Sequence, residues 1–311
     1  MSTIKEYDRV DVEAGGKDIH YPVIVKLTNS SGARGITICH NYEELREGCD
    51  KTSAASVDGN ILIEQYLDEK EVTVFWVFQD GNYYVAVIGN RHVKHNQEGV
   101  IPLPAGYSFP ASVTERYLEK VVPKAKEMFK SVGIKDGMMF MQCKVLDGEC
   151  LVYDIGYRLT GSLEYKILQA TCGYDPLEMM IRFALTGHMA EESIAEKVNP
   201  YLGRYSYNIS RLCAPGKIDR ITGREDVSKY PGVIDVVTAH EPGEIITEKM
   251  KGLLAQITVR VLGTSASLEA MYQDIETTQK QIQIISDRDE DLALAGVEPS
   301  DLDGVLADIN S

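Results

Sequence analysis

An amide, a carboxylate and a guanidinium lie close together around a predicted β-hairpin. Asp147 and Gly148 form a hairpin-turn signal between two predicted strands. Gln142 and Asp154 share the parity that can place both side chains on one face of the pair, and Arg158 follows a few residues later. Amide and carboxylate oxygens suit Mg²⁺, and a guanidinium suits phosphate. The hairpin is therefore a candidate site for a metal-bound phosphate, with a structural ion pair as the alternative.

A second candidate site begins at Lys26, near the end of a predicted apolar strand. The stretch that follows is small and glycine-rich, and it contains Ser31, Gly32, Arg34 and Gly35. The glycines let backbone N–H groups approach oxygens closely, while the lysine and the arginine supply charge. This composition is typical of a flexible phosphate-binding loop, although the P-loop pattern GxxxxGK[ST] is absent. A surface hairpin with glycine at its turn is the alternative.

A third candidate site lies where another predicted strand ends, after Glu64. The backbone of Gln65, Tyr66 and Leu67 leads into a connecting segment, where free polar groups can recognise the edge of an adenine ring. Glu71, seven residues after Glu64, can accept hydrogen bonds from both ribose hydroxyls. Because most runs of charge are exposed, a solvated turn is the alternative.

Arg91, Lys94 and His95 lie close together before a proline-containing loop. Such a group of cations can close on a phosphoryl group during its transfer. The alternative is a positive patch that relieves the charge of an acidic protein.

Composition limits the function classes that remain. The chain has 311 residues, enough for two or three domains, and a formal net charge of -15. That charge argues against nucleic-acid binding and against anionic membranes, since both need a basic surface. The six cysteines contain no CxxC pair, and neither a signal peptide nor a long apolar span is evident. We therefore expect a cytoplasmic protein in a reducing compartment.

Regular elements must hold these residues in place. An Asn41–Glu44 capping box and a Ser112–Glu115 capping box each predict the start of a helix. The predicted helices cover residues 41–53, 112–132, 163–172, 176–186 and 191–198, with one more from 267. The predicted strands cover residues 21–27, 37–39, 61–67, 71–79, 83–89, 138–145, 150–155, 205–212, 217–221, 232–239, 253–262 and 282–285.

Taken in order, four stretches resemble the ATP-grasp superfamily, and most closely its carbamoyl-phosphate-synthase-like and biotin-carboxylase-like members. They are YPVIVKLTNSSGARGI, ILIEQYL with Glu71, GIKDGMMFMQ and VYDIGYRLTG. The resemblance runs from about Tyr21 to Val198 and implies an α+β fold with ATP between two lobes. It divides the chain into an N-terminal extension (1–19), a lid subdomain (20–67), a large subdomain with the metal site (68–202), a β-rich C-terminal module (203–286) and an acidic tail (287–311).

The resemblance also implies a role for each site residue. ATP and Mg²⁺, with Mn²⁺ as a substitute, are the expected cofactors. By this resemblance, Lys26 and the glycine-rich loop bind phosphate, and Glu64 with residues 65–67 binds adenine. Glu71 binds the ribose. Gln142 and Asp154 bind the metal, and Arg158 contacts the transferred phosphate or the acyl phosphate. Arg91 and Lys94 are added to Arg158 as candidate catalytic residues.

This chain departs from the family pattern at several positions. The usual Glu-x-Asn-x-Arg motif reads Asp154-Ile155-Gly156-Tyr157-Arg158 here, so the carboxylate is shorter and one metal ligand is absent. Leu27 replaces a usual proline after the lysine. An α/β domain normally precedes this region in the family, and we expect the residues before Tyr21 to be too few to form it.

The function implied by the resemblance is ATP-dependent ligation of a carboxylate to an amine or a thiol through an acyl phosphate. Small-molecule carboxylates and amines are the expected partners, together with a second copy of the chain or a separate N-terminal domain subunit. The residues just after Arg158, including Ser162 and Glu164, lie where acceptor contacts are expected. The alternative is a catalytically idle nucleotide-binding subunit, or one half of a split enzyme.

Overall fold

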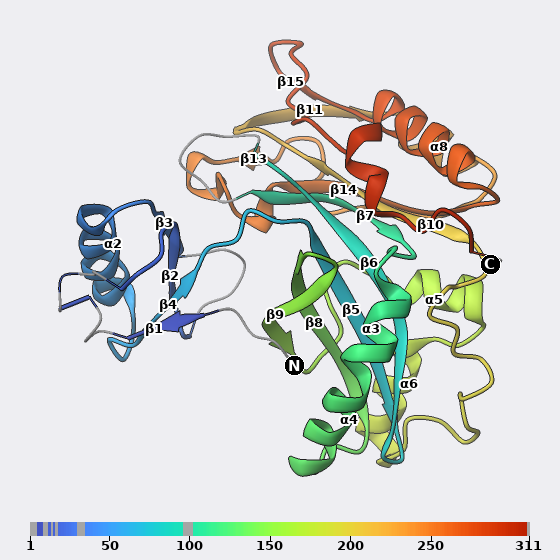
Figure 1. Cartoon of the computed structure of the whole chain (residues 1–311). Helices are drawn as coiled ribbons and strands as arrows, with labels where there is room; N and C mark the ends of the chain where they lie inside the picture. Colours follow the sequence, from blue (N-terminus) through green and yellow to red (C-terminus); the bar gives the residue numbers. More distant parts are fainter. Residues whose placement is uncertain are drawn as a thin grey trace.

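The computed structural model describes residues 5–8, 12–13, 15, 18–29, 35–95 and 102–309. It shows an α+β protein in which a small N-terminal lobe stands beside a larger one (Figure 1). The predicted fold class is confirmed. None of the helices in these ranges has both the length and the apolar character that a membrane crossing requires.

The N-terminal lobe is an antiparallel sheet covered by one helix. Its strand order is β1-β4-β2-β3. Val23 and Val25 of one strand and Ile63 of another pack with Leu45 of the helix to form the core of the lobe. The elements are β1 (Glu6–Tyr7), β2 (Val23–Leu27), β3 (Thr37–Cys39), α2 (Tyr42–Ala55) and β4 (Ile61–Gln65).

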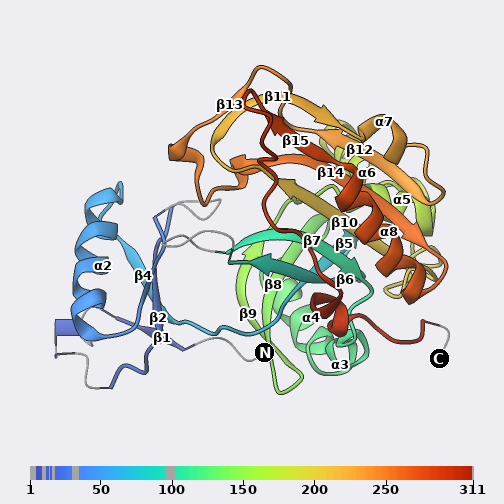
Figure 2. The ribbon, with the colours of Figure 1, turned by 90° about the horizontal axis from the view of Figure 1, so that it is seen from above.

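An eight-stranded sheet forms the centre of the larger lobe, in the order β12-β14-β10-β7-β6-β5-β8-β9. The chain enters it at β5, directly after the segment 66–70 that connects the lobes. Figure 2 shows the β8–β9 hairpin on the side nearest to the N-terminal lobe. The strands are β5 (Glu71–Gln79), β6 (Asn82–Lys94), β7 (Leu103–Phe109), β8 (Gly137–Leu146), β9 (Glu149–Gly156), β10 (Tyr205–Leu212), β12 (Val233–Thr238) and β14 (Ile257–Ser265).

Helices cover both faces of this sheet because its strands carry apolar residues on both sides. Trp76 of β5 packs edge-on against Phe129 of α4, with ring centroids 5.1 Å apart. The preceding residue, Phe75, belongs to the opposite face and packs in a core with Leu168 of α5 and Met179 of α6. The helices are α3 (Thr114–Lys120), α4 (Val122–Ser131), α5 (Tyr165–Cys172) and α6 (Pro176–Thr186).

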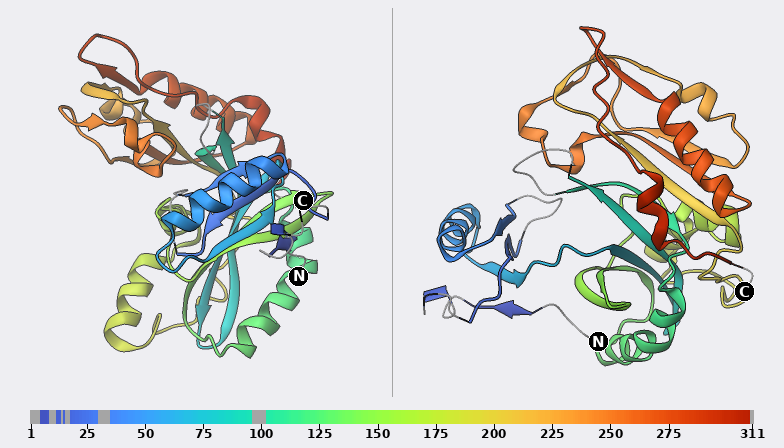
Figure 3. Two further views of the ribbon diagram at one scale, coloured as in Figure 1. Left: turned by 90° about the vertical axis from the view of Figure 1, so that its left-hand side faces the viewer. Right: turned by 45° about the horizontal axis from the view of Figure 1, so that its top comes forward.

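The C-terminal part of the chain extends the same sheet. Strands β10, β12 and β14 continue its hydrogen bonding, so the sheet crosses the expected boundary at residue 202. Helix α8 lies over this part of the sheet (Figure 3). Its Met271 and Ile275 share a core with Tyr207 and Val261. The remaining strands form a separate sheet in the order β13-β11-β15. These elements are β11 (Gly216–Thr222), α7 (Arg224–Val227), β13 (Ile245–Ile246), η1 (Glu248–Met250), η2 (Leu254–Gln256), α8 (Leu268–Gln281) and β15 (Gln283–Ser286).

The acidic C-terminal segment packs against the large sheet. It contains the short helix η3 (Pro299–Gly304), and Val305 forms a β-bridge with Ala111. The hydroxyl of Tyr205 donates a hydrogen bond to the carbonyl of Ala307 at 2.8 Å. These contacts fix the segment over the middle strands of the sheet.

The helix predicted over residues 191–198 is wrong, because this segment forms turns. Its backbone is engaged by the buried side chain of Gln79, which accepts from the N–H of Ile194 at 3.0 Å and donates to the carbonyl of Glu192 at 2.9 Å. Tertiary hydrogen bonds thus replace the helical ones.

Of the two predicted helix starts, one is confirmed. The side chain of Asn41 accepts a hydrogen bond from the Glu44 N–H at 2.9 Å. The start predicted at Ser112 is wrong, because the N–H of Ser112 bonds to the carbonyl of Gly304 and α3 has no side-chain cap. The expected single helix is also split into α3 and α4 near Pro123, which lies in the first turn of α4.

His92, buried on β6, makes stability depend on pH. Its Nε2 lies 2.7 Å from the Ser108 hydroxyl, and burial lowers its pKa to about 4 from 6.5. The unfolded chain therefore binds the extra proton more readily, and stability is lost as the pH falls from about 6.5 toward 4. In His92→Gln, we expect the free energy of unfolding to fall by roughly 3 kcal/mol less over this pH range than in the unchanged chain. Urea unfolding at pH 7.5 and 4.5 measures it, and an unchanged pH dependence in the variant would contradict the assignment.

Candidate functional site

The free end of the β8–β9 hairpin brings Gln142 and Asp154 together. Their Cα atoms are direct partners across the antiparallel ladder, at a point where the register shifts. At the other end of the hairpin, Asp147 and Gly148 have φ values of 52° and 75°, which confirms the predicted turn. Asp154 is exposed and Gln142 is half-buried, so both side chains are accessible to a ligand.

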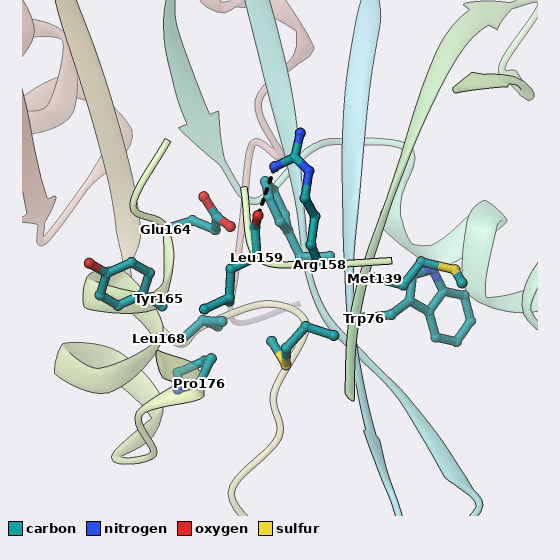
Figure 4. A pocket seen from close by; sticks show the side chains of 10 residues that line it. Trp76, Met139, Arg158, Leu159, Glu164, Tyr165, Leu168 and Pro176 are labelled. Carbon is teal, nitrogen blue, oxygen red and sulfur yellow. Dashed lines mark hydrogen bonds between the residues drawn. The ribbon is translucent and has the colours of Figure 1, made fainter. Parts of the chain in front are cut away.

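The position of the absent metal ligand is filled by an aromatic ring. A Cβ atom on Gly156 would lie 2.1 Å from the Phe140 ring, which is closer than any packed contact allows. The Arg158 guanidinium lies over the same ring, 5.1 Å from its centroid, and its Nη1 donates to the Leu159 carbonyl at 2.8 Å (Figure 4). Glycine at position 156 therefore belongs to a packed arrangement that holds Arg158.

On the N-terminal lobe, Lys26 of β2 forms an ion pair with Glu64 of β4. Burial raises the pKa of Glu64, Glu6 and Asp154 raise it further, and Lys26 opposes the shift. The β8–β9 hairpin that carries Asp154 lies on the side of the large lobe nearest to this lobe (Figure 2). Two residues expected to bind opposite ends of ATP thus contact each other.

The connecting segment leaves the backbone donor next to Tyr66 without an acceptor. The N–H groups of Gln65 and Tyr66 are used by the carbonyls of Lys5 and Pro22, at 2.8 and 2.9 Å. The N–H of Leu67 has no acceptor among the described residues. A donor next to the buried Glu64 fits the recognition of an adenine edge.

Glu71, at the start of β5, is surrounded by donors. It forms ion pairs with Arg91 and with Lys144, the latter at 2.8 Å, and accepts from the Tyr153 hydroxyl at 3.1 Å. Burial alone would raise the pKa of Glu71, but the two cations outweigh it and lower the pKa. Arg91 is thereby committed to Glu71 and ties β6 to the entrance of the large lobe.

Lys94 is not brought together with the other candidate residues. Its ammonium group lies 3.0 Å from Glu298 and 2.6 Å from Asp301 of the C-terminal segment. These two carboxylates already balance its charge. The contacts link the end of β6 to that segment.

The glycine-rich loop is described only in part. Ser31, Gly32 and Arg34 lie outside the described residues. Gly35 has a φ of +69°, and a Cβ atom there would lie 2.6 Å from the side chain of Leu27. Leu27 therefore packs against the glycine at the end of the loop.

Behind Arg158, a pocket lies between the sheet and helices α5 and α6 (Figure 4). Glu164 is 3% exposed, and its Oε2 accepts from the hydroxyls of Ser162, at 2.7 Å, and Thr160. Burial raises the pKa of Glu164, and these hydrogen bonds oppose the shift. The pocket is lined by Phe75, Trp76, Met138, Met139, Arg158, Leu159, Glu164, Tyr165, Leu168 and Pro176.

Sequence analysis did not assign roles to Phe140 and Lys144. Both lie on the same face of β8 as Gln142, so the alternation of side chains along the strand could have identified them as neighbours of the site. No sequence pattern predicts the contact between Tyr153 and Glu71. These residues are far apart in the sequence, and the strand register shifts next to Tyr153.

The residues fit one magnesium ion and disfavour a second. Among the described residues, no group of three His, Cys, Asp or Glu side chains could hold a metal by itself. Mg²⁺, however, commonly takes one or two protein oxygens and completes its shell with water and substrate phosphates. Asp154 and Gln142 can supply those oxygens, whereas Phe140 occupies the side of Gly156 from which another ligand would come.

Residues 3–192 match the family model described as the carbamoyl-phosphate synthase L chain, ATP binding domain. The L-arginine-specific L-amino acid ligase of Bacillus subtilis is 22% identical over 77% of this chain and 57% of its own length. The 2-oxoglutarate carboxylase small subunit of Hydrogenobacter thermophilus is 27% identical over 54% of this chain and 36% of its own length. The chain thus spans between about a third and somewhat over half of these relatives.

The fold matches solved structures across nearly the whole chain. The L-amino acid ligase of Bacillus licheniformis has a TM-score of 0.71 at 21% identity, covering 92% of this chain and 68% of that one. The chain therefore belongs to the family of the carbamoyl-phosphate synthase L chain ATP-binding domain, and with it to the ATP-grasp superfamily.

Proposed function

We propose that the chain is an ATP-dependent ligase that joins a carboxylate to an amine through an acyl phosphate, with a thiol as the alternative acceptor. The observation that carries the proposal is the pairing of Gln142 and Asp154 across one hairpin, on the side of the large lobe nearest to the lobe that holds Lys26 and Glu64. Arg158 follows a few residues beyond. Oxygen ligands and cations from two lobes then converge on the place where a triphosphate would lie.

The Lys26–Glu64 ion pair separates when the nucleotide binds. Lys26 then binds phosphate, and Glu64 with the Leu67 N–H receives the adenine edge. A buried carboxylate needs a compensating donor, and the exocyclic amine of adenine supplies one. Glu71, held by Arg91, is oriented toward the ribose.

Asp154 and Gln142 are the residues that would hold a magnesium ion, which would neutralise phosphate charge and orient the phosphoryl group. Arg158, fixed over Phe140 and by the Leu159 carbonyl, stabilises the transferred phosphoryl group as the substrate carboxylate attacks it and ADP leaves. The amine then attacks the acyl phosphate and displaces inorganic phosphate.

The second candidate function is a nucleotide-binding subunit without catalysis, and the packing of Phe140 on Gly156 favours it. Calorimetric titration with ATP, combined with a phosphate-release assay over a panel of carboxylates and amines, separates the two. Magnesium-dependent binding with release that requires both substrates supports the ligase. Binding with no release under any combination supports the idle subunit.

We expect Asp154→Asn to weaken Mg²⁺-ATP binding by about tenfold, because the variant loses the anionic ligand. Binding of ATP without metal should change little. Calorimetry in Mg²⁺ and in EDTA measures both affinities. Glu149→Gln, at the opposite end of the same hairpin, is the control; equal affinities for all three proteins in Mg²⁺ would refute the metal assignment.

We expect Gly156→Asn to destabilise the chain by about 2 kcal/mol and to leave magnesium affinity unimproved, because the new side chain meets the Phe140 ring. Adding Phe140→Ala makes room, so the double variant should lose less stability than the two single losses combined. Denaturant unfolding measures these values. The control is Gly161→Asn, where no atom obstructs a Cβ; equal costs at 156 and 161 would count against the packing argument.

We expect Lys26→Met to lower nucleotide affinity by about tenfold and also to lower stability, because it leaves Glu64 buried without a cation. In the double variant Lys26→Met/Glu64→Gln, stability should recover and nucleotide affinity should not. Thermal unfolding and calorimetry report the two effects separately. Recovery of both would mean that Lys26 serves only the fold.

A further inference from the structure

Helix α6 is apolar on two opposite faces. Met179 and Phe183 pack into the core that the helix shares with the large sheet. On the outer face, Leu177, Ile181 and Leu185 are 37%, 53% and 80% exposed. A surface helix normally carries polar residues on its outer side, and a helix that is apolar all round is normally covered. The outer face of α6 therefore has the character of a contact surface.

Helix α8 of the same molecule shows the usual pattern. Its Met271 and Ile275 are buried, whereas Glu269, Gln273 and Lys280 are exposed to water. The outer face of α6 presents large aliphatic groups instead. Single exposed apolar residues are common on protein surfaces and need no explanation, but a contiguous group of them marks an interaction site.

The three exposed side chains form one row, the α6 ridge (Leu177, Ile181 and Leu185). Successive members are four residues apart, so they lie one above another along the helix. Rows with this spacing fit into the grooves of a second helix at a crossing angle of about −50°. Figures 1 and 2 show α6 on the side of the large lobe away from the N-terminal lobe, so a partner on the ridge would leave the region between the lobes open.

Two opposite charges flank the ridge on the same side. Glu178 and Arg182 are four residues apart, a spacing at which such residues commonly pair. Here Arg182 forms its ion pair with Glu191 instead, and no ion pair within the described part of the chain involves Glu178. The Glu191 side chain is 82% exposed, so its pair with Arg182 is weak. Because a guanidinium has five donors, Arg182 can also bind a second carboxylate.

We propose that the α6 ridge docks against the α6 ridge of a second copy of this chain, with the two helices antiparallel about a two-fold axis near Ile181. Such an interface uses the same surface of both copies, so every contact occurs twice. Glu178 of each copy then lies beside Arg182 of the other copy, and both charges are paired. The proposal is independent of the proposed function, because it involves no residue assigned to the nucleotide or the metal.

The charges beside the ridge favour a second copy over other occupants. One glutamate and one arginine complement themselves when the direction of the helix is reversed. A uniformly acidic or basic partner would leave one of them unpaired, and the formal net charge of -15 disfavours an anionic lipid surface. Since one helix from each copy forms the centre, the interface belongs to the small class of less than about 1,200 Å². We therefore expect a dimer that forms at micromolar concentrations and dissociates on dilution.

Sedimentation velocity of the full chain over roughly 2 to 300 µM tests the proposal. We expect the sedimentation coefficient to rise from that of a monomer to that of a dimer across this range. Ile181→Glu and Leu185→Glu should each raise the dissociation constant at least about tenfold, because each places a charge inside the interface. The control is Ile245→Glu in the smaller sheet, where the isoleucine is 59% exposed; it should leave the dissociation constant unchanged.

Charge exchange tests the identity and the direction of the partner. Glu178→Arg gives the flank two arginines, and Arg182→Glu gives it two glutamates, so each variant alone should repel itself and stay monomeric. An equimolar mixture of the two variants should form a heterodimer, because arginines then face glutamates in both symmetry-related contacts. The double variant Glu178→Arg/Arg182→Glu should recover self-association.

A chain that stays monomeric at the highest concentration would overturn the proposal, as would a dimer that Ile181→Glu and Leu185→Glu leave intact. A mixture of the two charge variants that does not associate would overturn it as well. Because the substituted side chains are exposed, the melting temperatures of dilute samples should change by no more than about 2 °C. A large fall for both ridge variants would show that the ridge serves the fold and would count against the proposal.

Discussion

The arrangement of the large lobe depends on the pairing of one buried carboxylate. Glu71 stands at the first position of β5, where the chain leaves the connecting segment, and contacts Arg91 of β6, Lys144 of β8 and Tyr153 of β9. An unpaired charge at this depth would be costly. Four strands are thus fixed relative to one another at the end of the sheet nearest to the N-terminal lobe, and the hairpin that carries Gln142 and Asp154 is fixed with them.

Charge is distributed unevenly over an acidic protein. The formal net charge is -15, yet Lys26, Arg91, Lys144 and Arg158 lie on or beside the elements that carry the candidate site. Lys26, Arg91 and Lys144 are paired with glutamates and shape the site. Arg158 forms no ion pair with the described residues and is available to a ligand.

Local patterns were sufficient for most of the fold. Alternation along β8, the Asp147–Gly148 turn and the Asn41 cap depend on neighbouring residues, and each was predictable from the sequence. The failures at residues 191–198 and at Ser112 have one cause, since distant partners such as Gln79 and Gly304 take over the local backbone hydrogen bonds. The opposition of Gln142 and Asp154 was predictable from hairpin parity. The contact between Glu71 and Tyr153 was not, because β5 and β9 come close only when both pair with β8.

The contact between Gly156 and the Phe140 ring also limits how the sequence can change. A side chain at position 156 has no room while phenylalanine occupies position 140, and a smaller residue at 140 leaves a cavity beneath Arg158 while glycine remains at 156. Each single step therefore lowers stability before the second step can restore it. With glycine at 156 and phenylalanine at 140, the chain is therefore more stable than with either residue changed alone. A side chain at position 156 that could reach a metal would therefore require two coordinated substitutions, one at 156 and one at 140.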